Sequence, residues 1–349
     1  MITSRRKKRK TKTRRKILYT ILIISMVLLS GVIVFATNLS LQAQKATSKM
    51  YEPLEDEKTK DDTTKQFEKA KAEDSAFTLL IAGIENEENE KNGRSDVLLV
   101  ATVNPKTKKI SMLSIPRDTR IYIPDLGYKD KINHAYAFGG INYTINTVEE
   151  FLDIPIDYYI STNFQGFQDI VDTVGGVEVD VPFTFKAQLT ESLKWKTFTE
   201  GPMELNGNEA LAYVRMRKTD PEGDKGRNYR QQQVIKAVID EATSLSNITK
   251  IDDMIKDVGN NVKTNIPSSE YFSFIKLYQN LKSSPIENLQ LKGVDERING
   301  GSYFLLDEES LEEVKEQLKL NLDDFGQNAQ NAQSDVDKTN QISDLSIGE

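Results

Sequence analysis

The feature that most constrains this chain is a run of twenty residues without a charge, at residues 17–36. At about 1.5 Å per residue, a helix of that length spans roughly 30 Å, the thickness of the hydrocarbon core of a bilayer. The sixteen residues before it contain ten lysines and arginines and no acid. Basic flanks stay in the cytoplasm. We therefore predict a cytoplasmic head at 1–16, a single transmembrane anchor at 17–36, and an extracellular remainder.

Two other interpretations of this segment are open. The sequence Val34-Phe35-Ala36 resembles the cleavage site of a signal peptide, but the apolar run is long for one, so we favour an uncleaved anchor. A basic run can also be a nucleic-acid-binding arm or a nuclear signal. Its position directly against a membrane-length segment argues against this, and we expect no nucleic-acid partner.

The residue counts exclude several kinds of site. The chain has no cysteine and one histidine, His134. Thiol nucleophiles, iron–sulfur clusters and multi-histidine metal sites are therefore excluded, and a Ser-His-Asp triad is not expected. Without the ten positive charges of the head, the formal net charge falls from −7 to −17. The exported part is acidic, so a cluster of basic residues within it indicates a specific role and does not simply reflect a high basic content.

The rest of the chain divides by composition. Residues 37–75 are polar and charged, which is typical of a linker, and residues 321–349 are rich in Asn, Gln, Asp and Ser, which indicates a disordered tail. Residues 76–320 contain the apolar patterns of a folded domain. We expect strands at 77–84, 97–103, 109–116, 157–162, 177–181 and 289–294. We expect helices at 139–152, 164–174, 227–245, 251–258, 268–281 and 307–318. This alternation predicts one α/β domain with its sheet between helical layers.

Residues 213–233 hold an unusual concentration of planar hydrogen-bond donors: Arg215, Arg217, Arg227, Arg230 and Gln231. A guanidinium stays charged near neutral pH, and its fork matches two phosphate oxygens at once. Residues 227, 230 and 231 share one face of a helix, and the N-terminus of that helix also favours an anion. Residues 215 and 217 share a face only in an extended segment. The cluster predicts a phosphate or pyrophosphate site.

Polar segments at the ends of the predicted strands extend this site. Residues 93–96 precede the second strand and residues 114–120 follow the third, and ligands of α/β proteins bind at such strand ends. Asp96, with Glu85 or Asp118, could hold Mg²⁺, which uses few carboxylates and completes its shell with phosphate oxygens and water. The alternative is that the arginines pair with Asp118, Asp220, Asp224 and surface acids. We expect His134 to be structural.

Seven motifs in this order resemble the LytR-CpsA-Psr family. They are Gly93-Arg-Ser-Asp96, Ser114-Ile-Pro-Arg-Asp118, Lys131-Ile-Asn-His-Ala-Tyr136 with Gly139-Gly140, Asp172-Thr-Val-Gly-Gly-Val177, Leu205-Asn-Gly-Asn-Glu-Ala-Leu211, Tyr213-Val-Arg-Met-Arg217 and Gly226-Arg-Asn-Tyr-Arg-Gln-Gln232. The resemblance runs from about residue 77 to residue 281, and the predicted anchor matches it too. It implies a single three-layer α-β-α domain with a central mixed sheet after one transmembrane helix.

Members of this family are membrane-anchored phosphotransferases of Gram-positive bacteria, which move a teichoic acid or capsular polysaccharide from a polyprenyl-pyrophosphate carrier to peptidoglycan. The resemblance implies Mg²⁺ as cofactor, with Asp96 as its ligand. The family usually has Asp where this chain has Glu85, so the role of Glu85 as a second metal ligand is an expectation from chemistry. The residues that the resemblance places at the pyrophosphate are Arg94, Arg117, Arg215, Arg217, Arg227 and Gln231.

The chemistry of such a transfer suits these residues. Attack by a sugar hydroxyl on a phosphorus of the pyrophosphate develops charge that arginines and a metal stabilise. We expect Arg117, Asp118 and Arg227 to act in catalysis, and either Asp96 or Asp118 to take the hydroxyl proton. Apolar residues that could line a slot for the carrier tail are Phe164, Phe167, Ile170, Val234, Ile235 and Val238. Other functions left open are hydrolysis of the carrier pyrophosphate, a non-catalytic glycopolymer-binding module and a membrane-bound regulator.

Overall fold

The computed structural model describes residues 49–54, 75–85, 93–190, 192–217, 219–244 and 261–323. The predicted head, the predicted anchor, the predicted helix at 251–258 and nearly all of the predicted tail lie outside these residues. Within the described ranges, no helix combines the length and the apolarity that crossing a membrane requires.

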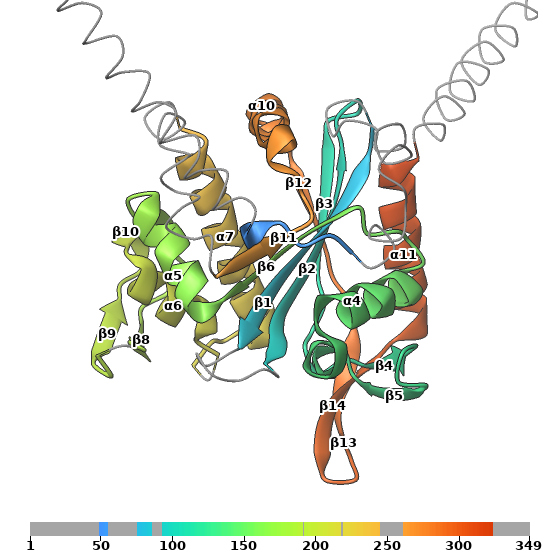
Figure 1. The fold of residues 1–349 in the computed structure, drawn as a ribbon. Helices are drawn as coiled ribbons and strands as arrows, with labels where there is room; N and C mark the ends of the chain where they lie inside the picture. The colour runs from blue at the N-terminus through green and yellow to red at the C-terminus, as the bar shows by residue number, and fades with distance from the viewer. Residues whose placement is uncertain are drawn as a thin grey trace, which may run out of the picture.

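A six-stranded mixed sheet forms the centre of the domain (Figure 1). Its order is β11 (Val262–Thr264), β6 (Tyr158–Asn163), β1 (Phe77–Glu85), β2 (Arg94–Asn104), β3 (Lys109–Ser114) and β12 (Ile286–Leu289). β1 pairs parallel with β6 and antiparallel with β2, and β12 pairs parallel with β3. The prediction of a mixed central sheet in an α/β domain is confirmed.

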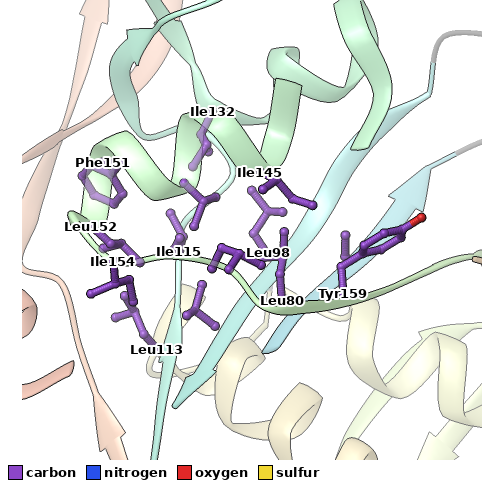
Figure 2. Close-up of a cluster of buried hydrophobic side chains, with 14 of the residues drawn as sticks. Leu80, Leu98, Leu113, Ile115, Ile132, Ile145, Phe151, Leu152, Ile154 and Tyr159 are labelled. Carbon is purple, nitrogen blue, oxygen red and sulfur yellow. The ribbon is translucent and has the colours of Figure 1, made fainter. Parts of the chain in front are cut away.

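Helices α4 (Ile132–Leu152) and α11 (Glu308–Leu322) pack on one face of this sheet. Alternate residues of the strands point to that face, because successive side chains of a strand point to opposite sides. Leu80, Leu98 and Leu113 lie there against Ile145 and Leu152 of α4, all at most 3% exposed (Figure 2). This cluster is the main core of the domain.

Helix α4 begins at Ile132, seven residues before the predicted start at 139. Gly139 and Gly140 form a kink inside this helix, with Gly140 at φ 64° and ψ −149°. A β-carbon on Gly139 would lie 2.0 Å from the ring of Tyr143. The kink thus needs glycine for its backbone angles at one position and for space at the other.

The other face of the sheet lies beneath α7 (Asp224–Ala242) and α10 (Tyr271–Leu281), the latter preceded by the short 3₁₀ turn η1 (Ser268–Glu270). The predicted helices at 227–245 and 268–281 are thereby confirmed, with shifted ends. Helices therefore flank the sheet on both sides, as the three-layer prediction requires (Figure 1).

A second core lies beside the sheet (Figure 1). It is built from α5 (Phe164–Thr173), α6 (Gly207–Arg215), the pair β7 (Val177–Val181) and β10 (Gly201–Leu205), and the hairpin β8 (Phe185–Gln188) and β9 (Trp195–Phe198). The predicted strand at 177–181 exists, but it pairs with β10 and takes no place in the central sheet.

Two hairpins complete the domain: β4 (Arg120–Ile123) with β5 (Tyr128–Lys131), and β13 (Gly293–Ile298) with β14 (Gly301–Leu306). The latter projects from the body of the domain in Figure 1. The predicted strand at 289–294 is wrong, because the chain leaves the central sheet after Leu289 and starts a separate strand at Gly293. Residues 290–292 connect the two strands.

Part of the predicted linker belongs to the fold. Tyr51 forms an isolated parallel bridge with Thr264 of β11, and the backbone N–H of Glu52 donates to the Thr264 carbonyl at 2.9 Å. The hydroxyl of Tyr159 donates to the Glu52 carbonyl at 2.7 Å, and Met50 is 7% exposed. Residues 49–54 are therefore docked at the β11 edge of the sheet.

Candidate active site

The carboxyl ends of four strands meet at one edge of the central sheet. β6, β1, β3 and β12 run in the same direction, since β2 is antiparallel to both β1 and β3. β2 begins at this same edge with Arg94. The residues at the edge are therefore the end of β1, the start of β2, and the segments that follow β3 and β6. Ligands of open α/β sheets bind at such carboxyl edges.

Asp96 occupies a bulge in the β1–β2 ladder. Ile84 pairs with Ser95 and Gly83 pairs with Val97, so Asp96 has no partner residue on β1. A bulge adds an unpaired residue to one strand and re-aims its side chain, and such bulges are frequent beside active sites. Here the bulge directs the Asp96 carboxylate to Arg117, which follows β3.

Arg117 lies at the centre of a charged cluster. Its Nη1 donates to Asp96 Oδ1 at 2.8 Å, and its Nε lies 3.6 Å from Asp118 Oδ2. Partial burial alone would lower the pKa of Arg117, but the carboxylates of Asp96, Asp118 and Glu85 outweigh it and raise that pKa above its ordinary value. The Arg117 side chain is 32% exposed. It is therefore fixed on one side and accessible to a ligand on the other.

The remaining members of the cluster are Glu85, Arg94 and Lys131. Arg94 Nη2 lies 3.2 Å from Glu85 Oε2, across the end of the ladder, and its side chain is 53% exposed. Lys131 Nζ donates to Asp118 Oδ1 at 2.7 Å and lies 5.4 Å from the ring centre of Tyr303. The sequence placed Lys131 in a family motif but gave it no role, because only the fold shows that β5 ends beside Asp118.

Arg215 and Arg217 lie where helix α6 ends. Arg215 is the last helical residue, and the backbone at Met216 turns to extended angles, φ −60° and ψ 131°. Both arginines are exposed. The guanidinium of Arg215 lies 4.5 Å from the ring centre of Phe164, which follows β6 directly. This cation–π contact ties Arg215 to the same edge of the sheet as Arg94 and Arg117.

Arg227 and Arg230 of helix α7, which were predicted to share one face, lie in different environments. Arg227 lies in its first turn and Gln231 one turn later, 7% exposed. Arg230 is fully buried in the second core: it donates to the carbonyls of Tyr213 and Met216 and pairs with the carboxylate of Asp220. The inclusion of Arg230 in the predicted anion-binding group is therefore wrong, and for this residue the alternative of pairing with an acid is confirmed.

The two carboxylates predicted to hold a metal both lie at this edge. Asp96 accepts from Arg117 and Glu85 accepts from Arg94, and both carboxylates act on the pKa of Arg117. Within the described part of the chain, no three His, Asp or Glu side chains gather into a metal-binding group. Mg²⁺ is usually held by one or two carboxylates together with substrate phosphates. The donor set therefore fits Mg²⁺ only in the company of a bound phosphate.

A large apolar cavity lies on the α7 side of the sheet, with a volume of about 470 Å³. Its floor is one face of the sheet, formed by alternate residues such as Leu79 and Ile81 of β1 and Leu99 and Ala101 of β2. α7 and α10 form its walls. Protein interiors contain few voids larger than a water molecule. A space of this size and apolarity is typical of a binding site for an apolar ligand.

The residues predicted to line a tail slot divide into two groups. Ile170 and Ile235 do line the cavity. Val234 belongs to the second core, Phe167 and Val238 pack against that core, and Phe164 lies under Arg215. Val234, Phe167 and Val238 therefore do not line this cavity, because the helices that carry them also have a face that packs inward. Phe164 lies at the charged edge of the sheet instead.

His134 has a structural contact. Its Nδ1 lies 2.8 Å from Oδ2 of Asp130, which belongs to β5, and the imidazole is 30% exposed. The residue lies in the first turn of α4, next to Lys131. This contact is consistent with the structural role expected for it.

The sequence matches the LytR-CpsA-Psr family over residues 37–320. A Bacillus licheniformis protein, polyisoprenyl-teichoic acid–peptidoglycan teichoic acid transferase TagU, is 40% identical over 313 residues, which cover 90% of this chain and 98% of TagU. The crystal structure of B. subtilis TagV superposes with a TM-score of 0.63 at 43% identity, covering 71% of this chain and 97% of that one. The structure of TagT bound to LI-WTA gives a TM-score of 0.61 at 36% identity, with coverages of 73% and 94%.

Proposed function

Because this chain belongs to the LytR-CpsA-Psr family, we propose that it transfers an anionic cell-wall glycopolymer from a polyprenyl-pyrophosphate carrier to peptidoglycan. Teichoic acid is the polymer we propose, since relatives that cover most of the chain are named as teichoic acid transferases. One observation carries the proposal. The floor of the apolar cavity runs along β1 and β2 toward the edge where Arg94 and Arg117 lie.

The cavity and the charged edge suit the two halves of the carrier. An isoprenoid tail gains free energy when its apolar surface leaves water, and the cavity lining is almost wholly apolar. The pyrophosphate needs charged donors at the end of that tail. Those we propose are Arg94, Arg117, Arg215, Arg217, Arg227 and Gln231.

The reaction is a substitution at phosphorus. A hydroxyl of a peptidoglycan sugar attacks the phosphorus that carries the glycopolymer, the bond from that phosphorus to the bridging oxygen breaks, and the lipid phosphate leaves with the electron pair. Guanidinium forks stabilise the charge that develops on the phosphoryl oxygens and on the leaving group. Arg117 is held in place for this by its bond to Asp96, so little reorganisation is needed when the charge develops.

Asp96 and Glu85 would hold Mg²⁺, which when bound would supply positive charge beside the pyrophosphate. The hydroxyl proton passes to a carboxylate at the same edge, and Asp96 and Asp118 are the two candidates. Asp118 is positioned by Lys131 and lies beside Arg117. Arg227 in the first turn of α7 contributes a positive charge together with the helix N-terminus.

The proposed location is the outer face of the cell membrane of a Gram-positive bacterium, with a single pass at residues 17–36 and the N-terminus in the cytoplasm. Its support is the uncharged run and the basic residues before it. The teichoic acid carrier would be membrane-bound as well, so a tethered enzyme meets its donor in the plane of the bilayer.

A single assay separates transfer from hydrolysis. The full-length protein in detergent is given a polyprenyl-pyrophosphate-linked glycopolymer, with and without a peptidoglycan acceptor, and release of lipid phosphate is followed. We expect release to accelerate with acceptor and polymer to appear on it. Release at one rate in both conditions, with free polymer as the product, would identify a hydrolase instead.

A further inference from the structure

A second cavity, about 440 Å³ in volume, lies at the same edge of the sheet. Ser114 and Pro116, just before Arg117, form one part of its wall, and the end of β12 with the segment that follows it, residues 288–293, forms another. The N-terminal half of α7 contributes Asn228, Tyr229 and Gln232. Gln232 also lines the apolar cavity, so the two cavities follow one another along the same helix.

The lining of this second cavity differs from that of a phosphate site. It has one acid, Glu222, and no arginine, and the other charged side chains in it are lysines. Its main polar groups are the amides of Asn228, Gln232, Asn288 and Gln290, each of which offers both donors and acceptors. In the described part of the chain, none of these four amides makes a side-chain hydrogen bond to protein. They are therefore available to a ligand that both donates and accepts.

Two aromatic rings accompany these amides. Tyr229 lines the cavity although 52% of its surface is exposed, and Phe304 closes the wall on the β14 side. Uncharged amides beside aromatic rings suit a sugar ring, which presents hydroxyl groups at its edge and C–H groups on its faces. An isoprenoid would leave the amides unsatisfied. A phosphate would find no guanidinium here, and the two lysines of the lining already lie beside acids, Lys225 at 4.0 Å from Glu222 and Lys292 at 3.9 Å from Glu313.

The position of this cavity relates it to the reaction. The backbone N–H of Phe304 donates to the carbonyl of Asp118 at 2.9 Å, and Thr119 forms a bridge with Phe304. The cavity wall is thus attached directly to the segment that carries Arg117 and Asp118. A sugar in the cavity would present a hydroxyl toward the phosphate that Arg117 holds, with the carboxylate of Asp118 beside it.

We propose that this polar cavity is the acceptor subsite, which binds a sugar of the peptidoglycan glycan strand. The assignment rests on the proposed transferase function and adds to it the surface that selects the acceptor. The donor lipid and its pyrophosphate occupy the apolar cavity and the arginines, and the acceptor approaches from the β12 side of α7.

The test compares Tyr229→Ala and Asn288→Ala with a matched control, Tyr128→Ala. Tyr128 is 48% exposed on the β4–β5 hairpin, away from both cavities. Full-length proteins are assayed with a short-chain polyisoprenyl-pyrophosphate glycoside as donor and a soluble peptidoglycan tetrasaccharide as acceptor. We expect the KM for the tetrasaccharide to rise about tenfold or more in the two cavity variants. The KM for the donor and the rate of hydrolysis without acceptor should stay at wild-type values, and the control should match wild type throughout.

Other outcomes overturn the assignment. A raised KM for the donor with an unchanged KM for the tetrasaccharide would place the donor saccharide in this cavity. Unchanged constants in both variants would leave the cavity without a role in acceptor binding. If the wild-type protein itself shows no acceptor-dependent release, the transferase function fails. Calorimetric titration of the tetrasaccharide into wild type and Tyr229→Ala then tests sugar binding by this cavity independently of turnover.

Discussion

The guanidinium of Arg117 donates a 2.8 Å hydrogen bond to the carboxylate of Asp96, the residue that the β-bulge leaves without a partner on β1. The bulge and the turn after β3 are separate features of the backbone, and this bond joins them. It holds a cation and a candidate metal ligand together at the edge of the sheet.

Replacing Arg117 by lysine tests whether the planar fork matters. Lysine keeps the charge but cannot bind Asp96 and a phosphate with one rigid group. We expect Arg117→Lys to lose about 10²- to 10³-fold in kcat, as for the loss of one transition-state donor, with an unchanged melting temperature. Transfer assays and thermal melting measure both quantities. Near-normal turnover would mean that charge alone suffices at this position.

Arg215 and Arg217 test the α6 end of the site. Both are exposed, so Arg215→Ala and Arg217→Ala should leave the fold intact and abolish attachment of the glycopolymer to peptidoglycan. Arg297→Ala, an exposed arginine on β13, provides the control and should attach polymer normally. The readout is polymer bound to purified cell wall from cells that carry each variant. Normal attachment by both α6 variants would remove the transferase assignment.

A larger side chain on the floor of the apolar cavity tests whether the carrier tail binds there. Ala101 is 6% exposed on β2 and its side chain faces the cavity, so Ala101→Phe would occupy part of the volume. We expect the KM for a long-chain carrier donor to rise about tenfold or more, while a short-chain donor keeps its wild-type KM. The short-chain donor serves as the control for folding and for the charged site. Equal effects on both donors would show that the tail does not lie in this cavity.

The Arg230–Asp220 pair should behave as part of the structure. Both side chains are almost completely buried, and removal of one partner leaves a buried charge unpaired. We expect Arg230→Ala to lower the free energy of unfolding by about 3–5 kcal/mol. Arg227→Ala, three residues earlier on α7, should reduce transfer with a much smaller loss of stability. Chemical denaturation curves measure both stabilities. A stable but inactive Arg230→Ala protein would contradict the structural role and show that Arg230 acts at the anion site.

Glu85 tests the proposed metal site. Glu85→Gln removes a charged oxygen ligand, so it should raise the Mg²⁺ concentration needed for half-maximal transfer, whereas Glu85→Asp should retain activity. Chelation with EDTA should stop transfer in all three proteins, and added Mg²⁺ should restore it. Binding of Mn²⁺ in the presence of pyrophosphate, followed by electron paramagnetic resonance, gives a second readout. An unaltered metal requirement in Glu85→Gln would exclude this residue from the metal shell.

Strands β1, β2, β3 and β6 were predictable from their apolar patterns, whereas β11, which has only three residues, was not predicted. What the same patterns did not reveal is that the two faces of the sheet differ. Leu80 and Leu98 face a filled core, while Leu79 and Leu99 face a cavity, yet all four are leucines in similar patterns. Whether a face is filled depends on the placement of α7 and α10, which is set by tertiary packing.

The charged site shows a similar limit. Its strand-end motifs were recognisable, and Arg94, Arg117 and Asp96 do come together at one edge. Arg230 was misassigned because the spacing of residues 227, 230 and 231 describes a common helical surface without saying which part of it turns toward the core. The identity of Asp220 as its partner depends on the loop before α7, which has no periodic pattern.

Met50 contributes to the wall of the apolar cavity, and only thirteen residues separate it from the predicted anchor, which ends at residue 36. Thirteen residues reach at most about 45 Å when fully extended. With that anchor in the bilayer, the pairing of Tyr51 with Thr264 attaches the end of the linker to the β11 edge of the sheet. Thr264 also lines the apolar cavity. We propose that such a tether keeps the cavity within about 45 Å of the bilayer, which limits the distance that a carrier tail must cover between membrane and protein.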